Sequence, residues 1–312
     1  MQIAFQIFLL AGGLAVALVA SDRAVAYTRA LAAALGAPAF VVGVALVSIG
    51  TDLPEIANSI AAHVQGEGDV NVGDSVGSTL TQYTLVLGLF PLVAVLAIDR
   101  LQIGLVSIFT IAGLGLTTLF VADGWLGRLD GAILVLSWAV FTAALVKVLP
   151  GHTADEPPPV AHRSRLVQGG IVLLALGFVG FGATVAVRSL VQLAELAGVP
   201  EFAIAFFGAS LGTSAPEIVV DFTALVRGAP GIALGDALGS SLVDATLSIG
   251  VGPLVAPAEV TPRLAVAGSL YALAAVAIVG ALLGVLRRHD RLTGLVLVGL
   301  YSFAYVVLIA AA

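Results

Sequence analysis

The sequence contains no cysteine and few charged side chains. Of its 312 residues, 10% are Asp, Glu, Lys or Arg, whereas about a quarter of a soluble domain is charged. The absence of cysteine excludes disulfides and thiolate metal sites. Hydrophobic residues make up 60% of the chain and the mean hydropathy is +1.12, so water is excluded as the solvent for most of the surface. The first residues, MQIAFQIFLLAGG, have no basic run and predict a first membrane span, not a cleaved signal peptide.

Long apolar segments predict an all-α polytopic membrane protein. A bilayer core of about 30 Å requires about 20 apolar residues per helix. On that basis the sequence predicts ten transmembrane helices, and the first and sixth continue to about residues 35 and 197. The predicted spans are 3–20, 39–64, 70–98, 101–122, 130–148, 166–187, 201–226, 232–256, 264–286 and 292–311.

Basic residues predict the orientation. If the N-terminus is extracytoplasmic, ten Lys and Arg residues fall in cytoplasmic connections and three fall on the other side. Both termini are therefore expected outside the cytoplasm of a cell that carries the protein in its plasma or inner membrane. The polar, Pro-rich segment 149–164 is expected to be a cytoplasmic linker between a first five-helix repeat, 1–148, and a second, 165–312.

An internal repeat appears at an offset of 162 residues. GTDLPEI at 50–56 corresponds to GTSAPEI at 212–218, and VGDSVGS at 72–78 corresponds to LGDALGS at 234–240. Over 50–88, 16 of 39 positions are identical to their counterparts, without a gap. Because each copy holds an odd number of spans, the copies enter the membrane from opposite sides. Such inverted-topology repeats place the substrate site near the midplane, between broken helices.

Each copy carries a proline within its second span, followed directly by a glutamate. Pro54 and Pro216 lack an N–H and disrupt the preceding turn, which predicts freed carbonyl oxygens around Ser48 to Thr51 and Ser210 to Thr213. A proline alone also fits a simple packing kink. An ionised Glu55 or Glu217 in mid-membrane would be costly, and such residues are usually functional.

The third span of each copy adds polar side chains one helical turn apart. Ser78 and Gln82 lie on one face, as do Ser240 and Asp244. The glycine pairs 73/77 and 235/239 have the small-xxx-small spacing that lets helices approach closely.

The candidate ligands are all oxygen donors, which suit Ca²⁺ and Na⁺ and not a transition metal. The histidines lie mostly near span ends or in loops. The segment Gly73-Asp74-Ser75-Val76-Gly77 fits the pattern of a serine hydrolase elbow, but that motif requires a strand–turn–helix context. The sequence therefore does not predict an enzyme.

These paired motifs resemble the cation/Ca²⁺ exchanger superfamily, especially its prokaryotic Na⁺/Ca²⁺ exchangers, over essentially the whole chain. That family has a G-T-S-x-P-E helix followed by a G-N-x-x-G-S-N helix in each of two repeats, in ten spans. The resemblance implies a set of ion-ligating side chains and two ligating backbone carbonyls. The side chains are Thr51, Glu55, Ser78, Gln82, Thr213, Ser214, Glu217, Ser240 and Asp244, and the carbonyls are those of Ser48 and Ser210.

The sequence departs from the family pattern at several of these positions. Asp52 stands where serine is usual and adds a fourth candidate metal-ligating carboxylate, Gln82 replaces asparagine, and Asp74 and Asp236 replace the asparagines of the third-helix motif. Because like charges raise one another's pKa, four clustered carboxylates need a proton or an additional cation. Asp221, one turn beyond Glu217, could line the ion path.

The resulting hypothesis is a secondary active antiporter that exchanges Ca²⁺ for Na⁺ by alternating access. An H⁺/Ca²⁺ or other divalent cation antiporter is the alternative, and a cation channel is the alternative of another class. The long first and sixth spans are candidates for the moving pair. The expected partners are membrane lipid and inorganic cations, with no nucleic acid and no cofactor, and the resemblance implies that a monomer suffices.

Overall fold

The computed structural model describes residues 2–149, 164–197 and 214–311, and within them the chain is helical apart from four two-residue strands. Among the described residues, six helices are long and apolar enough to cross a membrane, and there are seven if the segments Ala39–Thr51 and Leu53–Val64 form one broken span. Contacts divide the chain into two units, each built from both halves of the sequence: 1–53 with 151–236, and 54–150 with 237–312. The division of the chain into two five-helix repeats, 1–148 and 165–312, stays a prediction.

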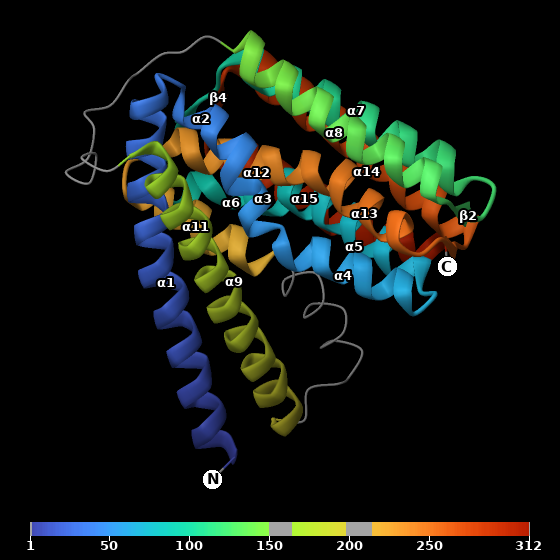
Figure 1. Cartoon of the computed structure of the whole chain (residues 1–312), viewed down its shortest axis with the longest axis horizontal. Helices are drawn as coiled ribbons and strands as arrows, with labels where there is room; N and C mark the ends of the chain where they lie inside the picture. The colour runs from blue at the N-terminus through green and yellow to red at the C-terminus, as the bar shows by residue number, and fades with distance from the viewer. Residues whose placement is uncertain (1, 150–163, 198–213, 312) are drawn as a thin grey trace. The chain divides into compact units, whose positions relative to one another are not determined.

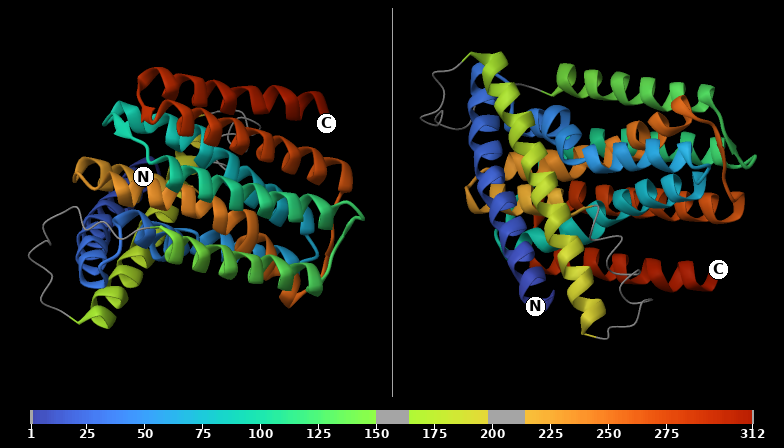
Figure 2. Two further views of the ribbon diagram at one scale, coloured as in Figure 1. Left: turned by 90° about the horizontal axis from the view of Figure 1, so that it is seen from above. Right: turned by 60° about the horizontal axis from the view of Figure 1, so that its bottom comes forward.

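Two long helices dominate the first unit. Helix α1 (Gln2–Leu35) and helix α9 (Arg165–Leu196) run alongside each other in Figure 1 and in the right-hand view of Figure 2. Their close approach requires glycine, because a Cβ on Gly13 would lie 2.6 Å from the carbonyl oxygen of Gly182. The remaining elements are shorter. They are α2 (Ala39–Val42), η1 (Gly43–Val47), α3 (Ser48–Thr51), α11 (Ala215–Val226) and the first half of α12 (Pro230–Val243).

In the second unit, helices α7 (Arg100–Val121), α5 (Gly68–Thr81) and α15 (Arg291–Ala311) contact α14 (Pro262–Leu286). Helix α7 lies along α14, and α8 (Arg128–Val148) packs against α13 (Ile249–Val255). Antiparallel strand pairs β1–β4 and β2–β3 tie helix ends together. The other elements of this unit are α4 (Leu53–Val64, from Pro54), η2 (Gln82–Val86), α6 (Leu87–Leu89), η3 (Phe90–Leu92), β1 (Leu96–Ala97), β2 (Trp125–Leu126), η4 (Asp244–Ser248), β3 (Ala258–Glu259) and β4 (Arg288–His289).

Two π-helical segments in the second unit occupy corresponding positions of the repeat. Segment η2 begins at Gln82 and η4 at Asp244, which are 162 residues apart. Single π turns within α-helices occur frequently at functional sites, because the wider turn displaces one residue out of the regular ladder. The two residues that open these turns are both predicted ligands.

A proline follows each π segment and leaves a carbonyl without its helical partner. Pro91 cannot donate to Leu87, four residues earlier, and Pro253 cannot donate to Ile249. A side chain from the opposite half of the chain donates to each carbonyl: His289 Nε2 lies 2.7 Å from Leu87 O, and Asn71 Nδ2 lies 3.0 Å from Ile249 O. The same backbone defect is therefore compensated twice, by different side chains.

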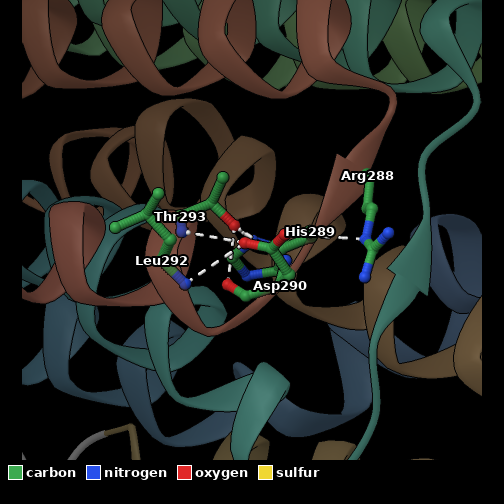
Figure 3. Close-up of polar contacts among 5 residues, drawn as sticks. All are labelled: Arg288, His289, Asp290, Leu292 and Thr293. Carbon is green, nitrogen blue, oxygen red and sulfur yellow. Dashed lines mark hydrogen bonds and ion pairs between the residues drawn. The ribbon is translucent and has the colours of Figure 1, made fainter.

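His289 is held in place by the turn that opens α15. Its Nδ1 lies 2.7 Å from the hydroxyl of Thr293, which also accepts from the backbone N–H of Asp290 at 2.8 Å (Figure 3). The Asp290 carboxylate in turn accepts from the N–H groups of Leu292 and Thr293, both at 3.2 Å. The imidazole is fully buried, so its orientation is fixed by hydrogen bonds at both nitrogens.

The predicted glycine packing is right for one position and wrong for another pair. A Cβ on Gly235 would meet the backbone of Phe40 and lie 3.1 Å from the Cα of Gly43, so α12 does approach η1 closely. Nothing lies within 4 Å of a Cβ on Gly73 or Gly77. These two glycines instead line a cavity of about 410 Å³ between α5 and α14, because the missing side chains leave space that α14 does not fill.

Candidate functional site

The candidate site of the first unit is built at two helix breaks. Asp52 ends α3 with φ −80° and ψ 6°, and Ser214 precedes α11 with φ −82° and ψ 9°. The two residues are 162 positions apart and share this sparsely populated backbone conformation, which interrupts a helix without reversing the chain. Each precedes a proline by two residues.

Two carboxylates meet at these breaks. Asp52 and Glu217 each offer an oxygen within 4.8 Å of the other, and both side chains are fully buried. Glu217 lies in the first turn of α11, where the unpaired N–H groups of the helix end favour a negative charge. Two buried acidic groups at this separation suit a shared cation, because burial of like charges without one is costly.

The backbone at the first break differs from the prediction in one respect. The carbonyl of Ser48 is not freed by Pro54, since it accepts from the N–H of Asp52 at 2.9 Å and from the hydroxyl of Thr51 at 3.1 Å. The residue four positions before Pro54 is Gly50, so Gly50 is the one that loses a helical donor. The Ser48 carbonyl has a lone pair for an ion only when the Thr51 hydroxyl donates elsewhere, for example to Val47 O at 3.2 Å. Ser214 and Thr51 are fully buried in this unit.

The remaining described candidates lie in the second unit and are also buried. Ser78 is on α5, Gln82 opens η2, Ser240 is on α12 and Asp244 opens η4. Glu55 is in the first turn of α4 and is 1% exposed. Ser210 and Thr213 lie outside the described residues.

Helices α5 and α12 meet at corresponding residues of the repeat. The hydroxyl of Thr79 lies 3.4 Å from the carbonyl oxygen of Ser241, exactly one repeat length away, and also donates to Ser75 O at 3.0 Å. The hydroxyl of Ser241 donates to Gln82 Oε1 at 2.9 Å. Ser241 therefore orients the amide of a predicted ligand, a role that the sequence did not indicate.

Asp236 and Asp221 were not among the predicted ligands, although both are fully buried in the first unit. Asp236 Oδ1 lies 3.1 Å from the hydroxyl of Thr51. Asp221 interacts with Asp236 and with Glu217. The sequence contained a signal for this group, since Asp236 replaces a motif asparagine and Asp221 follows Glu217 by one turn.

Comparison with known proteins gives one consistent result. The sodium/calcium exchanger protein family matches residues 5–147 and 168–310. The chain is 28% identical to the CaxA protein of Alkalimonas amylolytica over 91% of its own length and 92% of that protein. It is 27% identical to the sodium/calcium exchanger MaX1 of Methanosarcina acetivorans over 77% of its length and 80% of that protein.

The fold is also that of a solved exchanger. The structure of the sodium-calcium exchanger NCX_Mj superposes with a TM-score of 0.82 at 22% identity, over 97% of this chain and 99% of that one. The apolar helices and the membrane-protein relatives identify a multi-pass membrane protein. Since the family match covers most of both halves of the sequence, the chain belongs to the sodium/calcium exchanger protein family.

Proposed function

We propose that the protein is a secondary active antiporter that exchanges Ca²⁺ for Na⁺. The observation that carries this proposal is the pair of buried carboxylates, Asp52 and Glu217, whose oxygens approach within 4.8 Å at two helix breaks. Hard oxygen donors of this kind suit Ca²⁺ and Na⁺. Glu55, which follows Pro54 directly in the sequence, is proposed as the third carboxylate of the same ion site.

The charge of the site explains why two ion fluxes would be coupled. An empty cluster of buried carboxylates resists closure, because desolvated like charges repel each other. One Ca²⁺ or several monovalent cations neutralise the cluster and permit the site to be enclosed. The protein can then change its accessible side only when loaded, which is the requirement for exchange.

The proposed site also includes the polar residues of the two third spans and the backbone at the two breaks. Support comes from the matched positions of η2 and η4 and from the similar backbone angles at Asp52 and Ser214. We further propose ten spans in two inverted repeats, both termini extracytoplasmic, and alternating access in which α1 and α9 move. The full set of proposed ligands is Ser48, Thr51, Asp52, Glu55, Ser78, Gln82, Ser210, Thr213, Ser214, Glu217, Ser240 and Asp244.

The test is ⁴⁵Ca²⁺ uptake into proteoliposomes with an imposed Na⁺ gradient, or an imposed pH gradient without Na⁺. Uptake that follows the Na⁺ gradient and saturates supports Na⁺/Ca²⁺ exchange, whereas uptake that follows only the pH gradient supports the H⁺/Ca²⁺ alternative. Flux without any counter-ion would indicate a channel. Glu217→Gln should abolish uptake, and Glu195→Gln, at an exposed position near the end of α9, is the matched control.

The substitution Asp52→Ser tests the additional carboxylate. Removing one negative charge from the cluster should change the number of monovalent ions exchanged per Ca²⁺, measured as the membrane potential at which net flux reverses. An unchanged reversal potential and unchanged Ca²⁺ affinity would show that Asp52 does not bear on coupling.

A further inference from the structure

Asp221 is a buried carboxylate that does not belong to the proposed Ca²⁺ site. It projects from α11 in the first unit and is fully buried, and no N–H or hydroxyl group among the described residues donates to either of its oxygens. A buried carboxylate without a donor is costly enough that it normally marks a bound ion or a functional proton.

The group that Asp221 faces is another acid. Its interactions are with Asp236, at hydrogen-bonding range, and with Glu217. Asp236 is also fully buried, so the two carboxyl groups oppose each other away from water. Carboxylate oxygens cannot donate to one another, and a positive charge between them removes the repulsion.

Thr51 completes the arrangement with a third oxygen. Its hydroxyl lies 3.1 Å from Asp236 Oδ1, 3.1 Å from Ser48 O and 3.2 Å from Val47 O. The hydroxyl has one hydrogen for these three acceptors. The hydroxyl can donate to Asp236 Oδ1, and when it donates to a backbone carbonyl instead, its lone pairs can ligate a cation held beside Asp236.

The corresponding place in the other half of the repeat is built differently. Asp74, 162 residues before Asp236, accepts from the amide of Asn58 at 2.6 Å. The counterpart of Asp221 is Ser59, whose hydroxyl accepts from the N–H of Gly252 at 3.0 Å. The first-half aspartate therefore faces a neutral amide, whereas the second-half aspartate faces the carboxylate of Asp221 in addition to the Thr51 hydroxyl.

We propose that Asp221 and Asp236, with the hydroxyl of Thr51, form an additional Na⁺ site beside Glu217. Na⁺ fits better than Ca²⁺ here, because two carboxylates and one hydroxyl supply fewer oxygens than the six to eight that Ca²⁺ takes. This site would add one Na⁺ to those bound at the proposed exchange site. The proposal deepens the exchange function proposed above and rests on it for the identity of the monovalent ion.

The test counts bound Na⁺ in the purified full-length protein, by equilibrium binding of radioactive Na⁺ in Ca²⁺-free buffer at fixed alkaline pH. We expect Asp221→Asn and Asp236→Asn each to bind one Na⁺ fewer than the wild type. The double variant should lose no more than either single variant, because both residues serve one ion. Asp74→Asn, at the corresponding position with an amide partner, should bind as many as the wild type.

Retention of the full number of Na⁺ by both single variants would overturn the proposal and would assign the pair a shared proton. Size-exclusion chromatography monitors the folding of each variant, and a second variant keeps the test valid if one fails to fold.

The Na⁺-binding measurement also separates this inference from the proposed function. If the wild type shows no Ca²⁺ exchange but Asp221→Asn still loses one Na⁺, the exchange function fails and the additional site stands.

Discussion

Replacement of His289 by leucine should lower the free energy of unfolding by about 1–2 kcal/mol. The side chain is fully buried and bonds at both nitrogens, to Leu87 O and to the hydroxyl of Thr293, each at 2.7 Å. Leaving a buried carbonyl unsatisfied costs about 1–3 kcal/mol. Leu87 O also accepts from the N–H of Phe90, and Thr293 can donate to Asp290 O at 2.7 Å, so the lower part of that range is expected.

The same substitution should change how stability depends on pH. Because Leu87 O can only accept, Nε2 carries a hydrogen, and in the neutral ring Nδ1 accepts from Thr293. Burial lowers the pKa of His289, and the bond to Leu87 and the charge of Asp290 offset this only in part. The folded pKa thus lies below the unfolded value of about 6.5. Stability from this residue is therefore complete above that pH and falls as the pH drops below it.

The assay is chemical denaturation of the detergent-solubilised protein at a series of pH values from about 8 to 5. Wild-type protein should lose more stability over this range than His289→Leu, and the two curves should converge at low pH. Thr293→Val serves as the comparison that removes the Nδ1 partner, together with the hydroxyl's contacts to the Asp290 backbone, and leaves the imidazole in place. Equal stability and parallel pH curves for wild type and His289→Leu would refute both the hydrogen-bond accounting and the neutral assignment.

Three further predictions follow from the same structure. Asn71→Leu should lower the free energy of unfolding by a similar amount, about 1 kcal/mol, in the same denaturation assay. Its amide does not titrate, so the pH dependence of stability should match that of the wild type, and a changed pH curve would contradict this. Gly235→Ala should lower the free energy of unfolding by about 1–3 kcal/mol, because its Cβ would overlap the opposing backbone. Gly73→Ala should be neutral or stabilising, and equal effects of the two substitutions in thermal unfolding would count against the packing described. Asp22→Asn should change stability by less than about 1 kcal/mol, because its ion pair with Arg227 is exposed, and a larger, salt-independent loss would be inconsistent with that.

The sequence was informative about the site because the free-energy cost of burying a charged side chain restricts which residues can lie within a membrane. A glutamate after a proline in an apolar span has few structural uses, and Glu55 and Glu217 are indeed buried, as are the other described candidates. The membrane class and the family are confirmed by the apolar helices and the family match. The ligand set and the number of spans stay predictions.

The parts that the sequence did not indicate depend on long-range contacts. Nothing in the local pattern distinguishes Gly73 from Gly235, because both precede an aspartate at the same repeat position, yet one lines a cavity and the other meets backbone. The π turns at Gln82 and Asp244 also leave no compositional mark, since they insert a residue into the hydrogen-bond ladder and not into the hydropathy pattern. The histidines were predicted to lie mostly near span ends or in loops, whereas the bond of His289 to Leu87 joins residues 202 positions apart.

Each half of the chain supplies a side-chain hydrogen-bond donor to a carbonyl of the other half, so substitutions in the two halves are expected to depend on each other. His289 donates to a carbonyl that Pro91 leaves without its helical donor, and Asn71 does the same for Pro253, so each side-chain donor comes from the other half. A half expressed alone would lack this side-chain hydrogen bond to a buried carbonyl, and Leu87 O would keep only the N–H of Phe90. Loss of either proline would in turn release the distant donor from constraint, so substitutions at these positions are expected to arise as compensating pairs across the chain.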